Sequence, residues 1–153
     1  MRLSVMTDLE LVRQFMTLDE VWSLCTDDGV DIETYYPPSG MDRVWLGVYE
    51  GLEIVGMVYV HQQTSTTIQM HPYLLKGHKK KVRDLGKIFF EWAWSMPNIF
   101  KVNVTVPFIY HKLRNCCLKC GFKDEGINEM SYRKNGVLMN QWYMGAIRNA
   151  EHL

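Results

Sequence analysis

Three consecutive lysines, Lys79–Lys81, stand directly before a predicted helix that begins at Val82. The N-terminus of a helix carries a partial positive charge, so each lysine there costs roughly a few tenths of a kcal/mol unless an anion is bound. Backbone N–H groups at such a terminus are suited to a phosphate. The lysines therefore favour a phosphate site, and a solvated charge cluster is the alternative that the sequence leaves open.

Two histidines, His61 and His71, lie at the ends of predicted strands. An imidazole titrates near neutral pH, which is the property that a general base needs. A hydrogen-bonded structural histidine is the alternative interpretation for each. Glu53 or a chain of water molecules could take the role of the base instead.

Three of the four cysteines lie close together, at Cys116, Cys117 and Cys120, while Cys25 stands alone. A Cys-x-x-Cys pair near His111 could hold zinc or act in redox chemistry, but a structural zinc site needs four ligands, and no second pair has the required spacing. We therefore expect no metal. The thiols are expected to be reduced and to pack within a helix.

The elements that would position these groups follow from periodicity and turn residues. Apolar residues recur at helical spacing after Asp8 and again after Val82, and alternate with polar residues elsewhere. Trp92 and Trp94 are expected to pack in the core and at an interface rather than to form a stacking platform. The predicted order is a strand at 3–5, a helix from 9 to 24, a loop at 26–43, strands at 45–49, 54–61 and 66–71, a helix from 82 ended by Pro97, a strand at 101–107, a helix at 111–120 closed by Gly121, and a hairpin of 127–132 and 137–143 around Asn135-Gly136.

Length and charge limit the classes of function. The 153 residues predict one domain over 1–153, and 17 basic residues balance 17 acidic ones, which argues against nucleic acid or an anionic membrane as the main partner. The first twenty residues contain charges that interrupt every apolar run, so neither a signal peptide nor a membrane span is expected. We expect a cytoplasmic protein.

Three segments carry a resemblance to a known superfamily. They are Met70–His78 before the second helix, Val102–Pro107, and the Gly-Phe-x-x-Glu-Gly turn at 121–126. Over roughly the last two-thirds of the chain these segments resemble the GNAT acetyltransferases, and within that superfamily they are similar to small proteins of tailed bacteriophages. The resemblance implies an α/β (α+β) fold: a single GNAT-like domain with a mixed, mostly antiparallel central sheet flanked by helices.

The resemblance also implies a site for acetyl-CoA. In GNAT proteins the cofactor lies between two splayed strands, and its pyrophosphate meets backbone N–H groups before the next helix. Here Lys79 and Lys81 stand where the family motif has glycine or another small residue, which removes the usual close approach of the backbone. The cofactor-binding residues implied are Met70, His71, Lys76, Gly77, His78, Lys79, Lys80 and Lys81.

Catalytic roles come from the same resemblance. In the family a tyrosine acts as the general acid that protonates the departing thiolate, and its position corresponds to Cys117 here. An asparagine that contacts the cofactor in the family corresponds to a position near Tyr110. A thiol at Cys117 could donate the proton, or Tyr110 could supply a hydroxyl instead. His71 or His61 would be the general base.

Two functions from different classes are consistent with these residues. The first is an N-acetyltransferase that transfers an acetyl group from acetyl-CoA to an amine held between the Tyr35–Pro38 loop and the C-terminal hairpin. The second is a catalytically inactive GNAT-fold bacteriophage protein that acts in head or virion assembly through contacts with other assembly proteins. A homodimer is possible, because the strand with Trp142 and Tyr143 could pair with another subunit or simply close the sheet.

Overall fold

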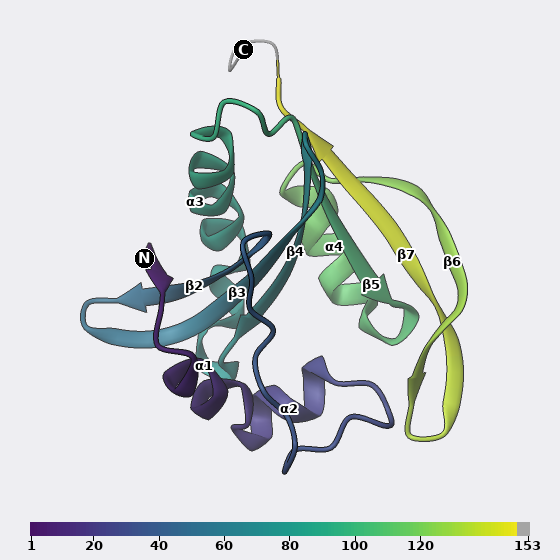
Figure 1. The fold of residues 1–153 in the computed structure, drawn as a ribbon. Coiled ribbons are helices and arrows are strands. Elements are labelled where there is room, and N and C mark those ends of the chain that lie inside the picture. Colours follow the sequence, from purple (N-terminus) through teal and green to yellow (C-terminus); the bar gives the residue numbers. More distant parts are fainter. Residues whose placement is uncertain (150–153) are drawn as a thin grey trace.

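A mixed sheet of seven strands forms the centre of the computed structural model, which describes residues 1–149. The strand order is β1-β2-β3-β4-β5-β7-β6, and every neighbouring pair is antiparallel except β4 and β5, which are parallel. Figure 1 shows the sheet running through the molecule to the long β6–β7 hairpin. The strands are β1 (Arg2–Met6), β2 (Arg43–Glu50), β3 (Glu53–Thr64), β4 (Thr67–Leu74), β5 (Lys101–Pro107), β6 (Lys123–Lys134) and β7 (Val137–Ile147).

Helices cover both faces of the sheet. α3 and α4 pack on one face through residues such as Phe89 and Cys117, while α1 and α2 pack on the other through Val12 and Val21. In Figure 1, α1 and α2 lie together at one end of the sheet. The helices are α1 (Leu9–Met16), α2 (Asp19–Cys25), α3 (Val82–Trp94) and α4 (His111–Lys119), with short 3₁₀ segments η1 (Lys76–Lys81) and η2 (Phe108–Tyr110).

The alternation of side chains along β3 supplies both cores. Val58 and Val60 point into the larger core under α3 and α4, and Met57 points into the smaller core under α1 and α2. Because successive side chains of a strand point to opposite faces, Tyr59 and His61 lie on the face of Met57. The same face carries the polar side chains of Gln63, Gln69 and Asn103.

The structure confirms the predicted fold class and nearly all predicted elements, with one correction near the N-terminus. The single helix expected from residue 9 to 24 is broken into α1 and α2 at Thr17 and Leu18. The Thr17 hydroxyl donates to the carbonyl of Arg13 at 2.9 Å, and Leu18 leaves helical geometry with a ψ of 133°. The apolar spacing continued across the break, so periodicity alone did not reveal it.

The β6–β7 hairpin turns at Asn135 and Gly136, as predicted. Both residues have positive φ values, 51° and 76°, which the Asn-Gly pair tolerates. The tip is fastened to the loop after α2, because the Asp28 carboxylate accepts the N–H groups of Asn135 at 3.0 Å and Gly136 at 2.7 Å. Thr26 adds a carbonyl that accepts from the Tyr132 hydroxyl at 3.1 Å.

We expect Asp28→Ala to release the hairpin tip without unfolding the domain. The amides of Asn135 and Gly136 lose their acceptor, so their hydrogen exchange should accelerate by about tenfold or more while amides of β5 stay protected. Asp31→Ala is a matched control, because the Asp31 carboxylate accepts only from nearby residues, such as the N–H of Glu33 at 3.0 Å. Equal exchange at the tip in both variants would show that Asp28 does not fasten it.

Strand β7 pairs on both sides, with β5 and β6, so β6 is one edge strand of the sheet and β1 is the other. The register of β6 shifts between Asn128 and Tyr132, where Met130 has a φ of 50°. Such a bulge is one way in which an edge strand is made unsuitable for further pairing.

No helix within residues 1–149 is long and apolar enough to cross a membrane.

Candidate acyl-transfer site

The central feature of the site is a gap between β4 and β5. The two strands pair only at Thr67–Lys101, Ile68–Val102 and Gln69–Asn103, and then diverge. β5 continues to pair with β7, whereas β4 from Met70 onward pairs only with β3. The edge of β4 that faces β5 therefore offers unpaired backbone N–H and C=O groups, which need another partner.

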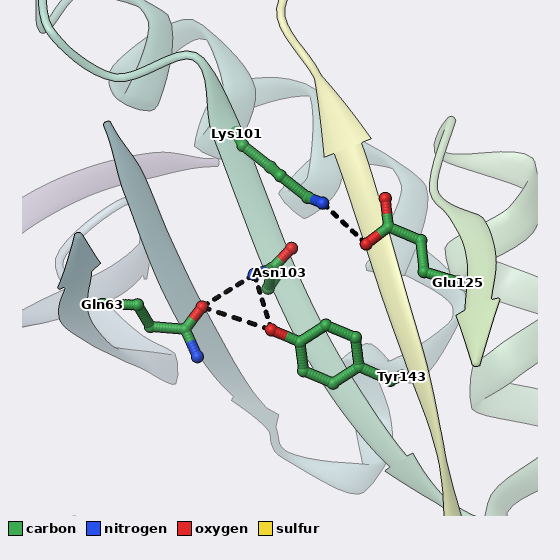
Figure 2. Close-up of polar contacts among 5 residues, drawn as sticks. All are labelled: Gln63, Lys101, Asn103, Glu125 and Tyr143. Atoms are coloured by element: carbon green, nitrogen blue, oxygen red, sulfur yellow. Dashed lines mark hydrogen bonds and ion pairs between the residues drawn. The ribbon is translucent and has the colours of Figure 1, made fainter. Parts of the chain in front are cut away.

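A polar network fixes the point at which the strands separate (Figure 2). The Asn103 amide donates to the Gln63 side-chain carbonyl and to the Tyr143 hydroxyl, each at 2.7 Å. Gln63 in turn donates to Gln69 at 2.6 Å, and Gln69 donates to Thr105 at 3.3 Å. Since these residues come from β3, β4, β5 and β7, the network ties four strands together at the closed end of the gap.

Glu125 lies beside this network and holds β6 over β7. Its carboxylate accepts from the Lys101 ammonium group at 2.7 Å, as Figure 2 shows. A Cβ at position 145 would stand 2.6 Å from the Glu125 carboxylate, so Gly145 provides the space that this side chain occupies. The closed end of the gap is therefore lined by the Lys101–Glu125 ion pair and by the neutral amides of the Asn103 network.

His71 lies on β4 beside the gap, on the face of α1 and α2. Its ring stacks with those of Tyr59 and His61, with centroids 5.5 and 5.4 Å away. Burial, and then the neighbouring His61, lower the pKa of His71 to about 4, so the imidazole is neutral at pH 7. Its Nε2 is buried and has no hydrogen-bond partner within the described residues. A neutral ring with a free nitrogen can accept a proton.

This buried histidine predicts an acid sensitivity of folding. In the unfolded chain His71 protonates near its ordinary pKa of about 6.5, whereas in the folded chain it stays neutral to about pH 4. The free energy of unfolding should therefore fall as the pH drops from 6.5 towards 4, by on the order of 2 kcal/mol. Urea unfolding of wild type and His71→Gln at several pH values measures this, and an equally steep fall in both proteins would contradict it.

Tyrosine hydroxyls gather at the open end of the gap. Tyr110 lies in η2, where β5 leads into α4, and Tyr132 lies on β6; burial raises the pKa of both hydroxyls. Burial also raises the pKa of Tyr73, which the Cys25 thiol and Tyr132 raise further. These hydroxyls remain protonated at neutral pH and can donate.

The lysine segment forms the 3₁₀ helix η1 rather than the first turn of α3. Two carboxylates of the same chain contact it: Glu20 accepts from the backbone N–H of Lys76 at 2.8 Å, and Glu50 accepts from the Lys81 ammonium group at 2.5 Å. Glu50 also lies 3.3 Å from Nδ1 of His78. The side-chain hydrogen bond from Lys81 lowers the pKa of Glu50. Within residues 1–149, Lys79 and Lys80 form no ion pair.

This segment fits phosphate through side-chain charge. A Cβ at Gly77 would meet no atom of the chain within 4 Å, so the packing of the chain itself does not require glycine there. Lys79 and Lys80 are exposed and carry mobile ammonium groups directly before α3. The residues present therefore fit the phosphates of a CoA thioester by charge, with Glu50 as an internal competitor for Lys81.

Cys117 lies apart from these groups, in the core beneath α3 and α4. Burial raises the pKa of its thiol to about 12. Cys120 packs against α3, where a Cβ on Gly86 would stand 2.9 Å from its sulfur. Within residues 1–149, no three His, Cys, Asp or Glu side chains gather where they could hold a metal ion.

The structure thus places Met70, His71 and Tyr110 beside the gap and residues 76–81 beyond the end of β4. The role of Cys117 as a proton donor stays a prediction, and its position in the core makes Tyr110 the better placed donor. Residue types alone did not reveal the contacts of Glu50 or of Asn103. Of these, only Asn103 left a signal, as a polar residue in an alternating strand.

The sequence matches the family described as a protein of unknown function, DUF2824, over residues 11–137. The chain belongs to this family. A search of curated proteins finds no match for this DUF2824 chain.

Acetyltransferases are among the solved structures with the same architecture. Spermidine N-acetyltransferase SpeG from Vibrio cholerae, in complex with CoA and spermine, is 14% identical, with a TM-score of 0.75 over 95% of each chain. A single-site mutant of SpeG gives 0.79 at 13% identity, covering 100% of the DUF2824 chain and 98% of the mutant. A probable acetyltransferase has a TM-score of 0.63 at 16% identity, and the match covers 71% of the DUF2824 chain and 63% of the acetyltransferase. These likenesses show that the DUF2824 chain has the GNAT fold.

Proposed function

We propose that this chain binds an acyl-CoA, most simply acetyl-CoA, in the gap between β4 and β5 and transfers the acyl group to an amine. The observation that carries the proposal is the divergence of the two parallel strands after Gln69 and Asn103, which leaves one edge of β4 without a partner. The pantetheine amides of a CoA thioester can use that edge. Lys79, Lys80 and Lys81 supply positive charge for the phosphates beyond the end of β4.

The bound CoA thioester would supply an activated acyl carbon. His71 holds its neutral Nε2 buried beside the gap, where it accepts the proton that the amine loses on attack. Tyr110, protonated at neutral pH, donates a proton to the departing sulfur. The network around Asn103 keeps the strands apart at a fixed point, so the reacting groups approach with constant geometry.

The acceptor amine would reach the gap from the face of α1 and α2. The boundaries on this side are the Tyr35–Pro38 loop, held by the bond from Arg13 Nε to the Tyr35 carbonyl at 3.1 Å, and the hairpin tip held by Asp28. The name of SpeG records spermidine as its acceptor. A primary amine is the acceptor class that we assign here.

Calorimetric titration tests the proposal. Acetyl-CoA should bind with one site per chain and a Kd between about 1 µM and 1 mM, the usual range for enzyme substrates. Desulfo-CoA should bind similarly, because the phosphates and pantetheine provide most contacts. Neither heat nor a rise in Tm at about 1 mM of either ligand would overturn the proposal.

A second candidate function is a role without catalysis, in bacteriophage head or virion assembly through protein contacts. Two observations favour it. The Lys81 ammonium group already donates to the Glu50 carboxylate. The hairpin also has apolar residues with a large exposed fraction: Ile127 (55%), Met130 (60%) and Val137 (59%). Exposed apolar residues gathered on one element suit a protein interface. If this is the function, the protein should not bind CoA. Ile127→Ser or Val137→Ser should then abolish its association with assembly proteins.

A further inference from the structure

A groove of about 700 Å³ lies between α3 and the end of α4, on the face of the sheet opposite to His71. The volume falls in the range of small-molecule sites. The residues that line it and carry the argument are Arg83, Lys87, Phe90, Trp94, Lys119 and Cys120. None of them has a role in the acyl transfer proposed above.

Two aromatic rings give the groove a flat apolar wall. Phe90 and Trp94 stack with centroids 5.5 Å apart and planes 10° apart, and Phe122 supports Phe90 at 5.3 Å. Trp94 packs against the core, as expected, but it is only half-buried and also lines the groove. A partly exposed tryptophan beside a cavity offers a surface on which a planar ring can stack.

The rim of the groove is positively charged. Arg83, Lys87 and Lys119 are exposed. None of them forms an ion pair with a carboxylate of residues 1–149. Glu91 is the single acidic residue among those that line the groove. Three unpaired cations against one carboxylate favour an anionic ligand.

We propose that this groove binds a nucleotide, with the base against Trp94 and Phe90 and the phosphates against Arg83 and Lys87. A nucleotide combines a flat ring with a negative group at short distance, as the groove combines an aromatic wall with a cationic rim. One nucleotide fits the volume. The inference does not depend on acyl transfer, because the gap between β4 and β5 contributes no residue to the groove.

Titration with ADP, followed by calorimetry, tests the inference. ADP should bind with a Kd of about 10 to 100 µM, and adenosine or inorganic pyrophosphate alone at least about tenfold more weakly, because each lacks one of the two contacts. Arg83→Glu should weaken ADP about tenfold or more. Lys112→Glu is the matched control, since Lys112 is an exposed lysine at the other end of α4.

Substitutions at Trp94 separate stacking from folding. Trp94→Phe keeps an aromatic ring and should retain ADP binding within about threefold, whereas Trp94→Leu should weaken it about tenfold while the protein still unfolds in one cooperative transition. Three outcomes would overturn the inference: no binding of ADP, binding that survives Arg83→Glu but is lost in Lys79→Glu/Lys80→Glu, or much tighter binding of a short thymidine oligonucleotide than of ADP. The second would place the nucleotide at η1, and the third would assign the groove to single-stranded nucleic acid.

Discussion

Reversing the charge of Lys79 and Lys81 together should weaken the binding of acetyl-CoA by about 100-fold, equivalent to about 2.7 kcal/mol. The variant Lys79→Glu/Lys81→Glu replaces two ammonium groups before α3 with two carboxylates. Since lysines stand at 79 and 81, where the motif it resembles has small residues, side-chain charge is the means by which this segment would hold phosphates. Calorimetry or a competitive fluorescence titration measures the change.

Glu50 provides the opposite test at the same segment. Glu50→Gln removes the carboxylate that accepts from Lys81 at 2.5 Å and faces His78, so Lys81 becomes available to a ligand. The affinity for acetyl-CoA should rise by about threefold to tenfold, and Lys112→Glu should leave it unchanged. Unchanged affinity in both Glu50→Gln and Lys79→Glu/Lys81→Glu would place the phosphates elsewhere and leave the lysines as a solvated cluster.

Loss of the His71 imidazole should lower kcat by about 100-fold or more while the Kd for acetyl-CoA stays within about threefold, because a general base acts on the amine and not on the thioester. His71 is neutral down to about pH 4 in the folded protein, so the acid limb of kcat/KM should lie near that pH rather than near 6.5. His71→Ala, assayed with an amine acceptor, measures both effects.

His61→Ala is the matched control for His71→Ala. Both rings belong to the same stack. Burial lowers the pKa of His61 too; Arg43 lowers it further, and Asp42 opposes the shift. We expect His61→Ala to cost less than about tenfold in kcat. A large loss in His61→Ala with little loss in His71→Ala would transfer the role of the base to His61.

The fold was accessible from the sequence because its determinants are local. Alternation in Lys101–Pro107, helical spacing after Val82 and the Asn135-Gly136 turn each act over a few residues, and the structure has the corresponding strand, helix and hairpin. The break between α1 and α2 was missed because apolar residues keep their spacing across Thr17 and Leu18. Backbone geometry at one residue decides that break.

The site was only partly accessible, because its contacts join residues distant in the chain. Glu50 and Lys81 are 31 positions apart, and Asn103 and Gln63 are 40 apart. No spacing rule connects such pairs before the strand order is known. Residues 79–81 were recognised from charge alone, yet their 3₁₀ geometry and the contact of Lys81 with Glu50 became visible only in the structure.

Hydrogen exchange along β4 tests the central claim most directly. The amides of residues 70–74 that are not bonded to β3 face the gap, so addition of acetyl-CoA should slow their exchange by about tenfold or more, with a smaller effect in Lys79→Glu/Lys81→Glu. Amides of β1, far along the sheet, serve as the internal control. Binding of acetyl-CoA without added protection in residues 70–74 would contradict a site between β4 and β5.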